Sequence, residues 1–275
     1  MRIHHINCGT MHPPSRRLFN GTGGWFERAT MVCHCLLIET DSGLVLVDSG
    51  FRPADLAEAS GALRLVIGLL RPNITDADTA AGHVRRLGFA VEDVRHIVLT
   101  HLDYDHAGGM PDFPHATVHL HARELDAAKR PVHRDERRRY QSRQWAHGPK
   151  WATYEEDGEP WFGFEAVRQL EGLPPEILLV PLHGHTRGHS GIAVDGGDGW
   201  LLAAGDAYFH RDRIDPDHPR CPKGLAGLEH VVQIDKASRV RNQERMRRLR
   251  ADHADEVRIF CAHDPVEFER HAAAG

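Results

Sequence analysis

The sequence predicts an α/β fold in one domain. Short apolar runs with the length of buried strands recur along the 275 residues, and segments with helical spacing separate several of them. The apolar runs 35–39 and 44–48 flank the turn-forming residues 40–43, which indicates a β-hairpin. A long helical stretch from about Lys236 to His253 lies between two late strands. Because no shift in composition marks a linker, we expect one domain over residues 1–275.

The remaining elements follow from the same patterns. Leu63, Val66, Ile67 and Leu70 keep helical spacing, but Leu65 and Leu69 make this helix apolar on more than one face. This favours packing in the core, with an acyl-chain groove or a dimer contact as alternatives. A second helix, capped by Thr75 or Asp76, is expected to end at Gly88. Further strands are expected at residues 97–99, 117–121, 177–182, 200–204 and 257–262.

Composition restricts the partners. The formal net charge of −5 argues against a nucleic-acid partner, which would favour a surplus of Lys and Arg. No apolar run approaches the roughly 20 residues that cross a bilayer, and the N-terminus lacks the apolar stretch of a signal peptide. The five cysteines have no disulfide-framework spacing. We therefore expect a cytoplasmic protein with a small-molecule substrate, no nucleic-acid or membrane partner, and a homodimer as an open alternative.

The segment from Thr100 to Gly109 carries the chemistry. It holds His101, Asp103, Asp105 and His106, four candidate ligands within six residues, directly after an expected buried strand. A loop that leaves a rigid strand can direct such side chains to one or two points in space. Histidine and carboxylate together suit zinc, iron, manganese or cobalt, so the segment predicts a metal site.

Three further candidate ligands stand at the ends of expected strands. His185 follows the strand 177–182, Asp206 follows 200–204, and His263 follows 257–262. Each alone is a weak signal, because polar residues are common in turns. Their shared position at strand ends indicates that they join the first segment in one site. By contrast, Cys33 and Cys35 are interpreted as strand packing, and His119 and His121 as ordinary strand residues, since no third ligand pairs with the two histidines.

These segments, together with Leu46-Val47-Asp48-Ser49-Gly50, resemble the five ordered motifs of the metallo-β-lactamase superfamily over about residues 33–265. The resemblance implies a four-layer αββα sandwich with two metal sites. It assigns His101, Asp103 and His185 to the first metal and Asp105, His106 and His263 to the second, with Asp206 bridging both. Asp48 would brace the ligand loop. His189 would be a support or pocket residue rather than a ligand.

Two positions depart from the family's usual pattern. Asp103 stands where histidine is usual, which makes iron or manganese plausible beside zinc and would also fit a weaker or empty first site. Arg187 stands where proline is common, and it would either contact an anionic substrate group or form a surface salt bridge. The resemblance therefore implies two divalent metal ions, with zinc as the first choice.

The resemblance also implies hydrolysis by a metal-bridging hydroxide. Asp105 or Asp206 would hold the proton of the nucleophile, and Tyr208 would donate to the developing oxyanion, with a pocket-wall or core role as its alternative. The motifs are similar to those of the N-acyl homoserine lactonases, although these usually place the tyrosine three residues after the bridging aspartate. This favours opening of a lactone or ester.

Other functions remain open. The same metals would serve hydrolysis of a β-lactam, thioester or phosphodiester. A diiron oxidoreductase and a non-enzymatic metal-binding protein are the alternatives outside hydrolysis. Residues 130–173, which carry Trp145, Trp151 and Trp161, are interpreted as an insertion of helix and loop that covers the active site.

Overall fold

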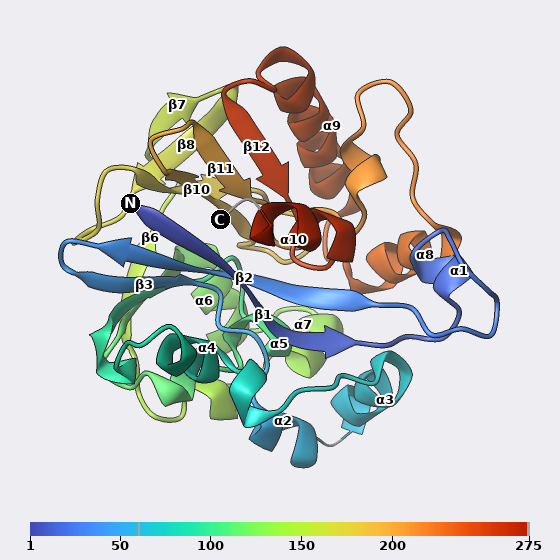
Figure 1. Ribbon diagram of the computed structural model, residues 1–275, viewed down its shortest axis with the longest axis horizontal. Helices are drawn as coiled ribbons and strands as arrows, with labels where there is room; N and C mark the ends of the chain where they lie inside the picture. Colours follow the sequence, from blue (N-terminus) through green and yellow to red (C-terminus); the bar gives the residue numbers. More distant parts are fainter. Residues whose placement is uncertain (60, 274–275) are drawn as a thin grey trace.

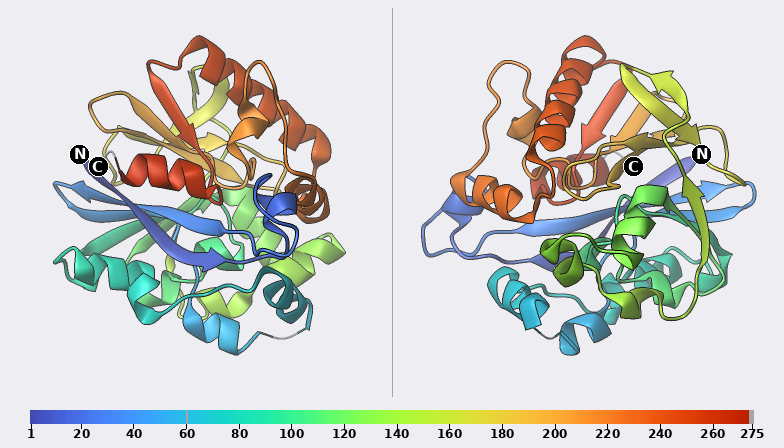
Figure 2. Two further views of the ribbon diagram at one scale, coloured as in Figure 1. Left: turned by 45° about the vertical axis from the view of Figure 1, so that its right-hand side comes forward. Right: turned by 180° about the vertical axis from the view of Figure 1, so that it is seen from behind.

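Runs of consecutive buried apolar residues form the strands of two sheets that pack face to face (Figure 1). The computed structural model describes residues 1–59 and 61–273, so residues 60, 274 and 275 of the expected domain lie outside it. Helices cover the outer faces of both sheets, and the turned views show α9 on one side and α3 and α4 on the other (Figure 2). This is the four-layer αββα sandwich that the sequence predicts.

Each sheet has six strands. The first contains β1 (Arg2–Met11), β2 (Met31–Thr40), β3 (Gly43–Val47), β4 (Val94–Val98), β5 (Thr117–His121) and β6 (Lys150–Tyr154), in that spatial order. The second contains β12 (Val257–Phe260), β11 (Trp200–Ala203), β10 (Ser190–Asp195), β9 (Ile177–Pro181), β8 (Phe164–Gln169) and β7 (Glu159–Trp161), also in spatial order.

The helices connect and cover these strands. They are α1 (Arg16–Phe19), α2 (Pro53–Ala57), α3 (Gly61–Leu70), α4 (Ala80–Arg86), α5 (Tyr104–Ala107), α6 (Ala122–Lys129), α7 (Arg134–Arg139), α8 (Lys223–Val232), α9 (Lys236–Asp252) and α10 (Pro265–Ala272). Single 3-10 turns occur at Asp76–Asp78, Val91–Asp93, Met110–Asp112, Ser142–Trp145 and Arg211–Ile214.

The pairing of the strands brings several strand ends together. β2 and β3 form the expected antiparallel hairpin, and from β3 to β6 the first sheet is parallel. In the second sheet β11 and β12 are parallel, whereas the other neighbouring strands run antiparallel. The carboxyl ends of neighbouring parallel strands meet at one edge of their sheet. Loops that leave β3, β4, β11 and β12 therefore start close to one another within each sheet.

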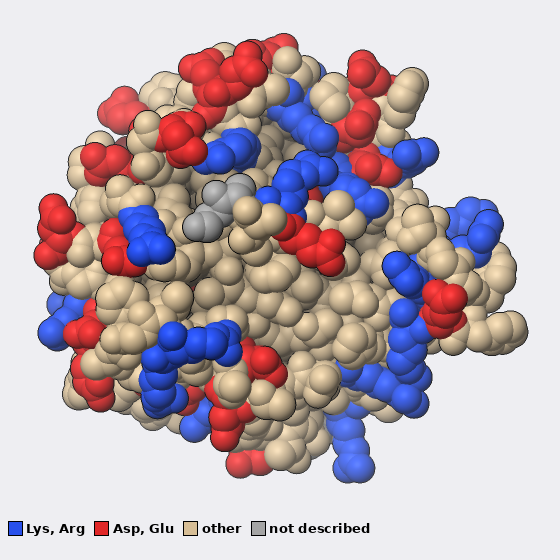
Figure 3. Space-filling view, viewed as in Figure 1, with Lys and Arg blue, Asp and Glu red and all other residues tan. Residues whose placement is uncertain are grey.

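Three apolar layers hold the sandwich together. Between the sheets, Ile38 and Val47 of the first pack with Leu179 and Phe260 of the second. The outer face of the first sheet packs against α4 and α6, and the outer face of the second packs against Met246 and other residues of α9. On the surface, Lys and Arg are interspersed with Asp and Glu around the rim of one face, whose middle is largely uncharged (Figure 3).

The helix that was expected around residues 63–70 forms α3, but the prediction that it packs in the core is wrong for one side. Leu63 and Leu70 are buried, whereas Leu65 is 77% exposed and Leu69 is 50% exposed. The helix lies at the periphery, so a single apolar stripe is enough to hold it. The next helix also starts later than predicted: Thr79 caps α4 by accepting from the Gly82 amide, and Thr75 instead caps a separate 3-10 turn.

The interpretation of residues 130–173 as an insertion of helix and loop is wrong for residues 150–169. Its first part does form α7 and a 3-10 turn. Residues 150–169, however, supply β6 to the first sheet and β7 and β8 to the second. This segment is where the chain crosses between the sheets, so its aromatic side chains pack within the sandwich itself. Trp161 belongs to the outer-face cluster of the second sheet.

Two further expectations concern cysteines and membranes. All five cysteines lie in the described part of the chain and are unpaired. Within residues 1–59 and 61–273, none of the helices combines the length and the apolar character that a membrane span requires.

The layer between the sheets gives a test of the fold. Ile38→Ala is expected to lower the free energy of unfolding by about 2–5 kcal/mol, because Ile38 is fully buried and its removal leaves a cavity. Leu65→Ala, on the exposed side of α3, is expected to change it by less than about 0.5 kcal/mol. Chemical denaturation of both variants measures this. Equal losses would contradict the described placement of α3.

Candidate metal centre

Loops at the carboxyl ends of five strands meet at one end of the sandwich. Asp48 follows β3, the segment 101–106 follows β4, and His185, Asp206 and His263 follow β9, β11 and β12. Tight turns make this possible: Gly184 has a φ of +137°, and a Cβ on it would lie 2.4 Å from the Arg239 backbone nitrogen. Only glycine fits such a turn without displacing α9. All seven candidate ligands that the sequence predicted are brought together here.

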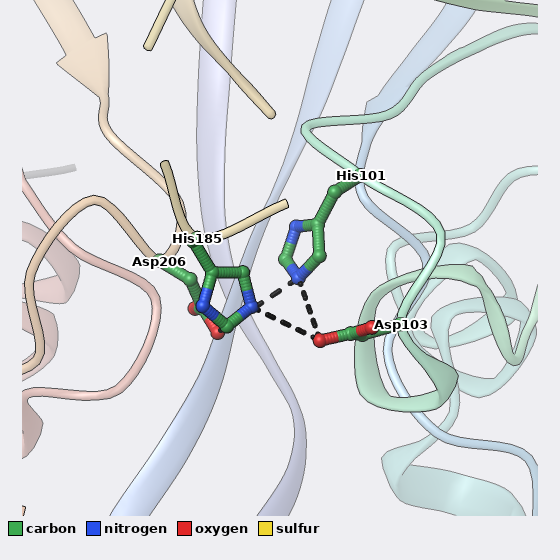
Figure 4. Close-up of side chains that lie close together, drawn as sticks. All are labelled: His101, Asp103, His185 and Asp206. Atoms are coloured by element: carbon green, nitrogen blue, oxygen red, sulfur yellow. Dashed lines mark hydrogen bonds and ion pairs between the residues drawn. The ribbon is translucent and has the colours of Figure 1, made fainter. Parts of the chain in front are cut away.

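Four side chains form the first half of the cluster (Figure 4). The Asp103 Oδ2 lies 3.3 Å from His101 Nε2 and 3.0 Å from His185 Nε2. The Asp206 Oδ2 lies 3.3 Å from His185 Nε2 and 3.8 Å from His101 Nε2. Two imidazole nitrogens and two carboxylate oxygens thus converge on one small region, and this donor set is one that zinc, iron and manganese accept.

The other oxygen of Asp206 belongs to the second half. Its Oδ1 lies 3.3 Å from His106 Nε2 and 3.0 Å from His263 Nε2. Asp105 completes this group, with its Oδ2 3.5 Å from His263 Nε2. A single carboxylate therefore faces both groups, one oxygen toward each.

Asp48 determines how His106 is oriented. Its Oδ2 accepts hydrogen bonds from His106 Nδ1 and Thr100 Oγ1, both at 2.8 Å, and its Oδ1 accepts the Thr100 amide at 2.8 Å. With its proton on Nδ1, the His106 ring presents the lone pair of Nε2 to Asp206. Asp48 is thus a bracing carboxylate behind the cluster, which is the place that the sequence resemblance implies.

Two more rings are fixed in the same tautomer. Thr100 Oγ1 donates to Asp48, so it accepts from His101 Nδ1 at 2.9 Å. His263 Nδ1 donates to the Val32 carbonyl at 2.7 Å. In both rings the Nε2 lone pair is left facing the cluster. This is the arrangement in which histidine binds a metal through Nε2.

Burial controls the charges in the cluster. It lowers the pKa of His101 to about 4, so this ring is neutral near pH 7. It also raises the pKa of Asp105. Burial opposes ionisation of Asp206 as well, but His263 and His106 hold the pKa of that carboxyl well below its ordinary value. Burial opposes protonation of His106 and His263, but Asp206 raises the pKa of both rings, to well above the ordinary value for His106. A divalent cation bound here would replace those protons and balance the ionised carboxylates.

Buried atoms without partners test whether a metal fits. Among the described residues, His101 Nε2 and His106 Nε2 make no hydrogen bond, although carboxylate oxygens lie 3.3 Å from each. An unpaired buried polar group is costly, and a cation between the lone pairs and the carboxylates removes that cost. The residues present therefore fit divalent metal ions.

His189 lies behind the cluster rather than in it. Its Nδ1 donates to the Leu182 carbonyl at 3.0 Å, and its Nε2 accepts the Asp206 amide at 2.9 Å. Both ring nitrogens are occupied, so the ring positions Asp206, in agreement with the supporting role that was expected.

Arg187 forms ion pairs rather than facing the cluster. Its Nε and Nη2 donate to the two carboxylate oxygens of Glu136 at 3.0 and 2.9 Å, and its Nη1 donates to Asp126 at 3.2 Å. Glu136 belongs to α7 and Asp126 to α6. Of the two expected roles, the structure supports the salt bridge, which ties both helices to the loop of His185.

The structure contradicts the role in the site that was expected for Tyr208. The side chain is fully buried in the apolar cluster that includes Leu202 and Met246, and its hydroxyl donates to Glu267 Oε1 at 3.1 Å. The chain turns sharply after Asp206, so the side chain two residues later points into the core beneath α9. The prediction that Tyr208 donates to an oxyanion is therefore wrong, and its alternative as a core aromatic is correct.

Sequence reasoning missed a cation beside Asp103. Arg139 of α7 is largely buried, with its Nη1 3.3 Å from Asp103 Oδ2 and 3.2 Å from the His185 carbonyl oxygen. Burial alone would raise the pKa of Asp103, but Arg139 and His101 hold it well below its ordinary value. The carboxylate that replaces the usual histidine thus comes with its own counter-charge.

Glu124 of α6 was also missed, and it joins two of the ligand loops. Its Oε1 accepts the Leu102 amide at 2.9 Å and the Tyr140 hydroxyl at 3.1 Å. Its Oε2 accepts the Thr186 hydroxyl at 2.7 Å and the Gly188 amide at 3.1 Å. No local motif marks this residue, because its partners come from distant parts of the chain.

Cys33 lies nearer to the cluster than expected. It is buried among apolar residues as predicted, yet its sulfur lies in one group with ligand atoms of Asp105 and His263. Burial, reinforced by Asp105, raises the pKa of this thiol well above its ordinary value. We therefore retain its interpretation as a packing residue at the edge of the site.

Comparison with known proteins identifies the family. The sequence matches the metallo-β-lactamase superfamily over residues 29–259. A "probable metallo-hydrolase" of Mycobacterium tuberculosis is 42% identical over 265 residues, which cover 96% of this chain and 81% of that protein. The chain therefore belongs to the metallo-β-lactamase superfamily, and it is a hydrolase of that superfamily, whose members bind divalent metal ions.

At lower sequence identity the chain is also similar to N-acyl homoserine lactonases. An N-acyl homoserine lactonase of Bacillus thuringiensis is 24% identical over 210 residues, covering 75% of this chain and 74% of that enzyme. The solved structure of an N-acyl homoserine lactone hydrolase with the product N-hexanoyl-L-homoserine bound at its catalytic metal centre superimposes with a TM-score of 0.71. It is 19% identical, with 98% of this chain and 95% of that one covered, and it shows the shared fold.

Glu124 gives a test of how the cluster is built. Glu124→Ala leaves four buried donors unpaired, so it is expected to lower the free energy of unfolding by about 3 kcal/mol or more. Tyr140→Phe removes one of these bonds and is expected to cost about 1 kcal/mol. Chemical denaturation measures both, and amide hydrogen exchange at Leu102 and Gly188 should accelerate in the first variant. Similar losses in both variants would refute the joining role.

Proposed function

We propose that this protein is a dinuclear metal-dependent hydrolase that opens a lactone or ester. One observation carries the proposal: the two oxygens of Asp206 face two separate groups of histidine and carboxylate ligands. A carboxylate in that position can bridge two cations. The rigid tautomers of His101, His106 and His263 support the same arrangement.

The proposed ligands divide between two ions. His101, Asp103 and His185 would hold the first, Asp105, His106 and His263 the second, and Asp206 both. Zinc suits this donor set, and iron or manganese are the alternatives that the carboxylate of Asp103 favours. Because Arg139 offsets the charge of Asp103, the net charge at the first position stays close to that of a site with a neutral histidine there. This supports retention of a metal at the first position.

Two bound divalent cations would supply an activated water and polarise the scissile carbonyl. The residues of this chain contribute orientation and proton handling. Asp103, Asp105 and Asp206 keep 9%, 8% and 5% of their surface exposed, whereas His101 is fully buried. The carboxylates therefore form the accessible side of the cluster, where a substrate would approach. We assign Asp105 and Asp206 as the groups that accept and return the proton of the nucleophile.

The substrate class rests on similarity to relatives. The Bacillus thuringiensis relative is named for N-acyl homoserine lactone hydrolysis, and a similar fold holds the ring-opened product of such a lactone at its metal centre. Tyr208 does not supply the oxyanion donor in this chain, so carbonyl polarisation falls to the metal positions. We also propose a small-molecule substrate without a nucleic-acid or membrane partner, and a cytoplasmic location in keeping with five unpaired cysteines.

The substrate class is tested by ring opening. The purified protein, loaded separately with zinc, manganese and iron, is expected to release acid from short- and long-chain N-acyl homoserine lactones, and a chelator should abolish the release. Absence of turnover with every metal would reject lactones. Esters, thioesters, phosphodiesters and β-lactams, assayed alongside, would then show whether the site hydrolyses another bond.

The bridging role is tested separately from the substrate. Asp206→Ala is expected to lose bound metal at both positions and at least about a hundredfold in turnover, because one side chain serves both ions. His189→Ala, a change directly behind the cluster, should retain two metal ions. Metal analysis after dialysis measures this. Normal metal content in the Asp206 variant, or loss of one ion in the His189 variant, would show that the ligands are assigned wrongly.

A further inference from the structure

A second group of potential ligands lies outside the candidate metal centre. It consists of His121 at the end of β5, Glu156 in the loop between β6 and β7, and His183 two residues after the end of β9. One ligand atom from each residue lies within 4.8 Å of the other two. The sequence offers no third ligand near His121, because Glu156 and His183 are far away along the chain and only the fold brings them to it.

The neutral ring of His183 carries one proton but faces two hydrogen-bond acceptors. His183 Nδ1 donates to the His189 carbonyl at 3.1 Å, so the neutral ring carries a lone pair on Nε2. That nitrogen lies 2.6 Å from Glu156 Oε1, which is itself an acceptor. Two lone pairs at this distance repel each other. The neutral ring can instead place its proton on Nε2, but it then leaves the His189 carbonyl without this donor, whereas a cation bound at Nε2 would satisfy both acceptors.

His121 adds an unsatisfied nitrogen aimed at the same point. Its side chain is fully buried, and its Nε2, 4.0 Å from Glu156 Oε1, has no hydrogen-bond partner among the described residues. Its Nδ1 accepts the Arg123 amide at 3.1 Å, which caps α6. To bind a cation through Nε2, the ring must move its proton to Nδ1 and give up this bond. The site is therefore expected to bind less tightly than one whose tautomers are already set.

The group is accessible from outside. A cavity of about 410 Å³ is lined by Glu156 and His183 together with Pro181 and Asn242. It offers an entry path and room for a water molecule as a further ligand. Arg123 Nη1 lies 2.8 Å from Glu156 Oε1 and competes for that oxygen. Glu156 is 38% exposed, however, so its carboxylate is free to turn and offer its second oxygen.

We propose that His121, Glu156 and His183 bind a zinc ion separate from the candidate metal centre. Two imidazole nitrogens, one carboxylate oxygen and a water satisfy four-coordinate zinc, whereas magnesium and calcium prefer oxygen ligands alone. The three ligands come from the first sheet, the crossing segment and the second sheet. The ion therefore joins the two halves of the sandwich where the chain passes between them. Its ligand His183 lies two residues before His185 of the candidate metal centre.

Zinc binding by Glu156→Gln tests the proposal. Metal-stripped protein is dialysed against rising zinc concentrations, and bound zinc is counted. The unaltered protein is expected to bind one equivalent more than Glu156→Gln, and that last equivalent should raise its melting temperature. Glu155→Gln, a change at the neighbouring exposed residue, should behave like the unaltered protein. The difference of one ion does not depend on how many ions the candidate centre holds or on which substrate is hydrolysed.

The competing explanation, a hydrogen bond between His183 and Glu156 without a metal, predicts equal zinc counts and equal zinc-dependent melting temperatures in all three proteins, and that result would overturn the proposal. A measurement on the unaltered protein is independent of how the variant folds. Nitrogen NMR of labelled histidines should show the His121 ring changing tautomer as the last zinc equivalent binds. A His121 signal that stays unchanged through saturation would likewise refute the site.

Discussion

Four carboxylates buried within reach of one another are the constraint around which this end of the sandwich is built. Asp103, Asp105 and Asp206 face the cluster, and Asp48 stands behind it. Buried negative charges are tolerated only where cations or hydrogen-bond donors surround them. Histidine rings, Arg139, and the backbone amide and hydroxyl of Thr100 supply these partners. The turns that hold the donors in place follow from this requirement.

The ligand loops are also joined to one another by side-chain hydrogen bonds and ion pairs. Glu124 binds donors from both the loop after β4 and the loop after β9, and Arg187 ties the second of these to α6 and α7. The geometry of the cluster thus depends on side chains that lie outside it, such as Glu124 and Arg187. Such support is what allows ligand atoms to stay within the narrow distances that metal chemistry needs.

The candidate ligands could be predicted from the sequence because each stands in a short motif directly after an apolar strand. The αββα arrangement was implied by the resemblance of those ordered motifs to the metallo-β-lactamase superfamily. Strand β1 was missed because its buried positions are interspersed with polar ones such as His4 and Asn7. Strands β6 to β8 were missed because their aromatic and charged residues resemble a loop. Local pattern carries no information about which sheet a strand will join.

The errors at single residues have a similar origin. Tyr208 lies two residues after a correctly predicted ligand, but the direction of its side chain depends on how α9 packs above it. Arg139 meets Asp103 across 36 positions of sequence, and Glu124 meets its four partners across 16 to 64 positions. Neither residue stands in a recognisable motif. Long-range pairing of side chains is decided by the fold, and one sequence taken alone does not reveal it.

The pairing of Asp103 with Arg139 has a consequence for how this protein can change over evolutionary time. A histidine at position 103 would leave the guanidinium without its counter-ion, and loss of Arg139 alone would leave an extra negative charge against the cluster. Either single step passes through a less favourable intermediate. The two positions are thus epistatic, and descendants of this chain should exchange them together or keep both.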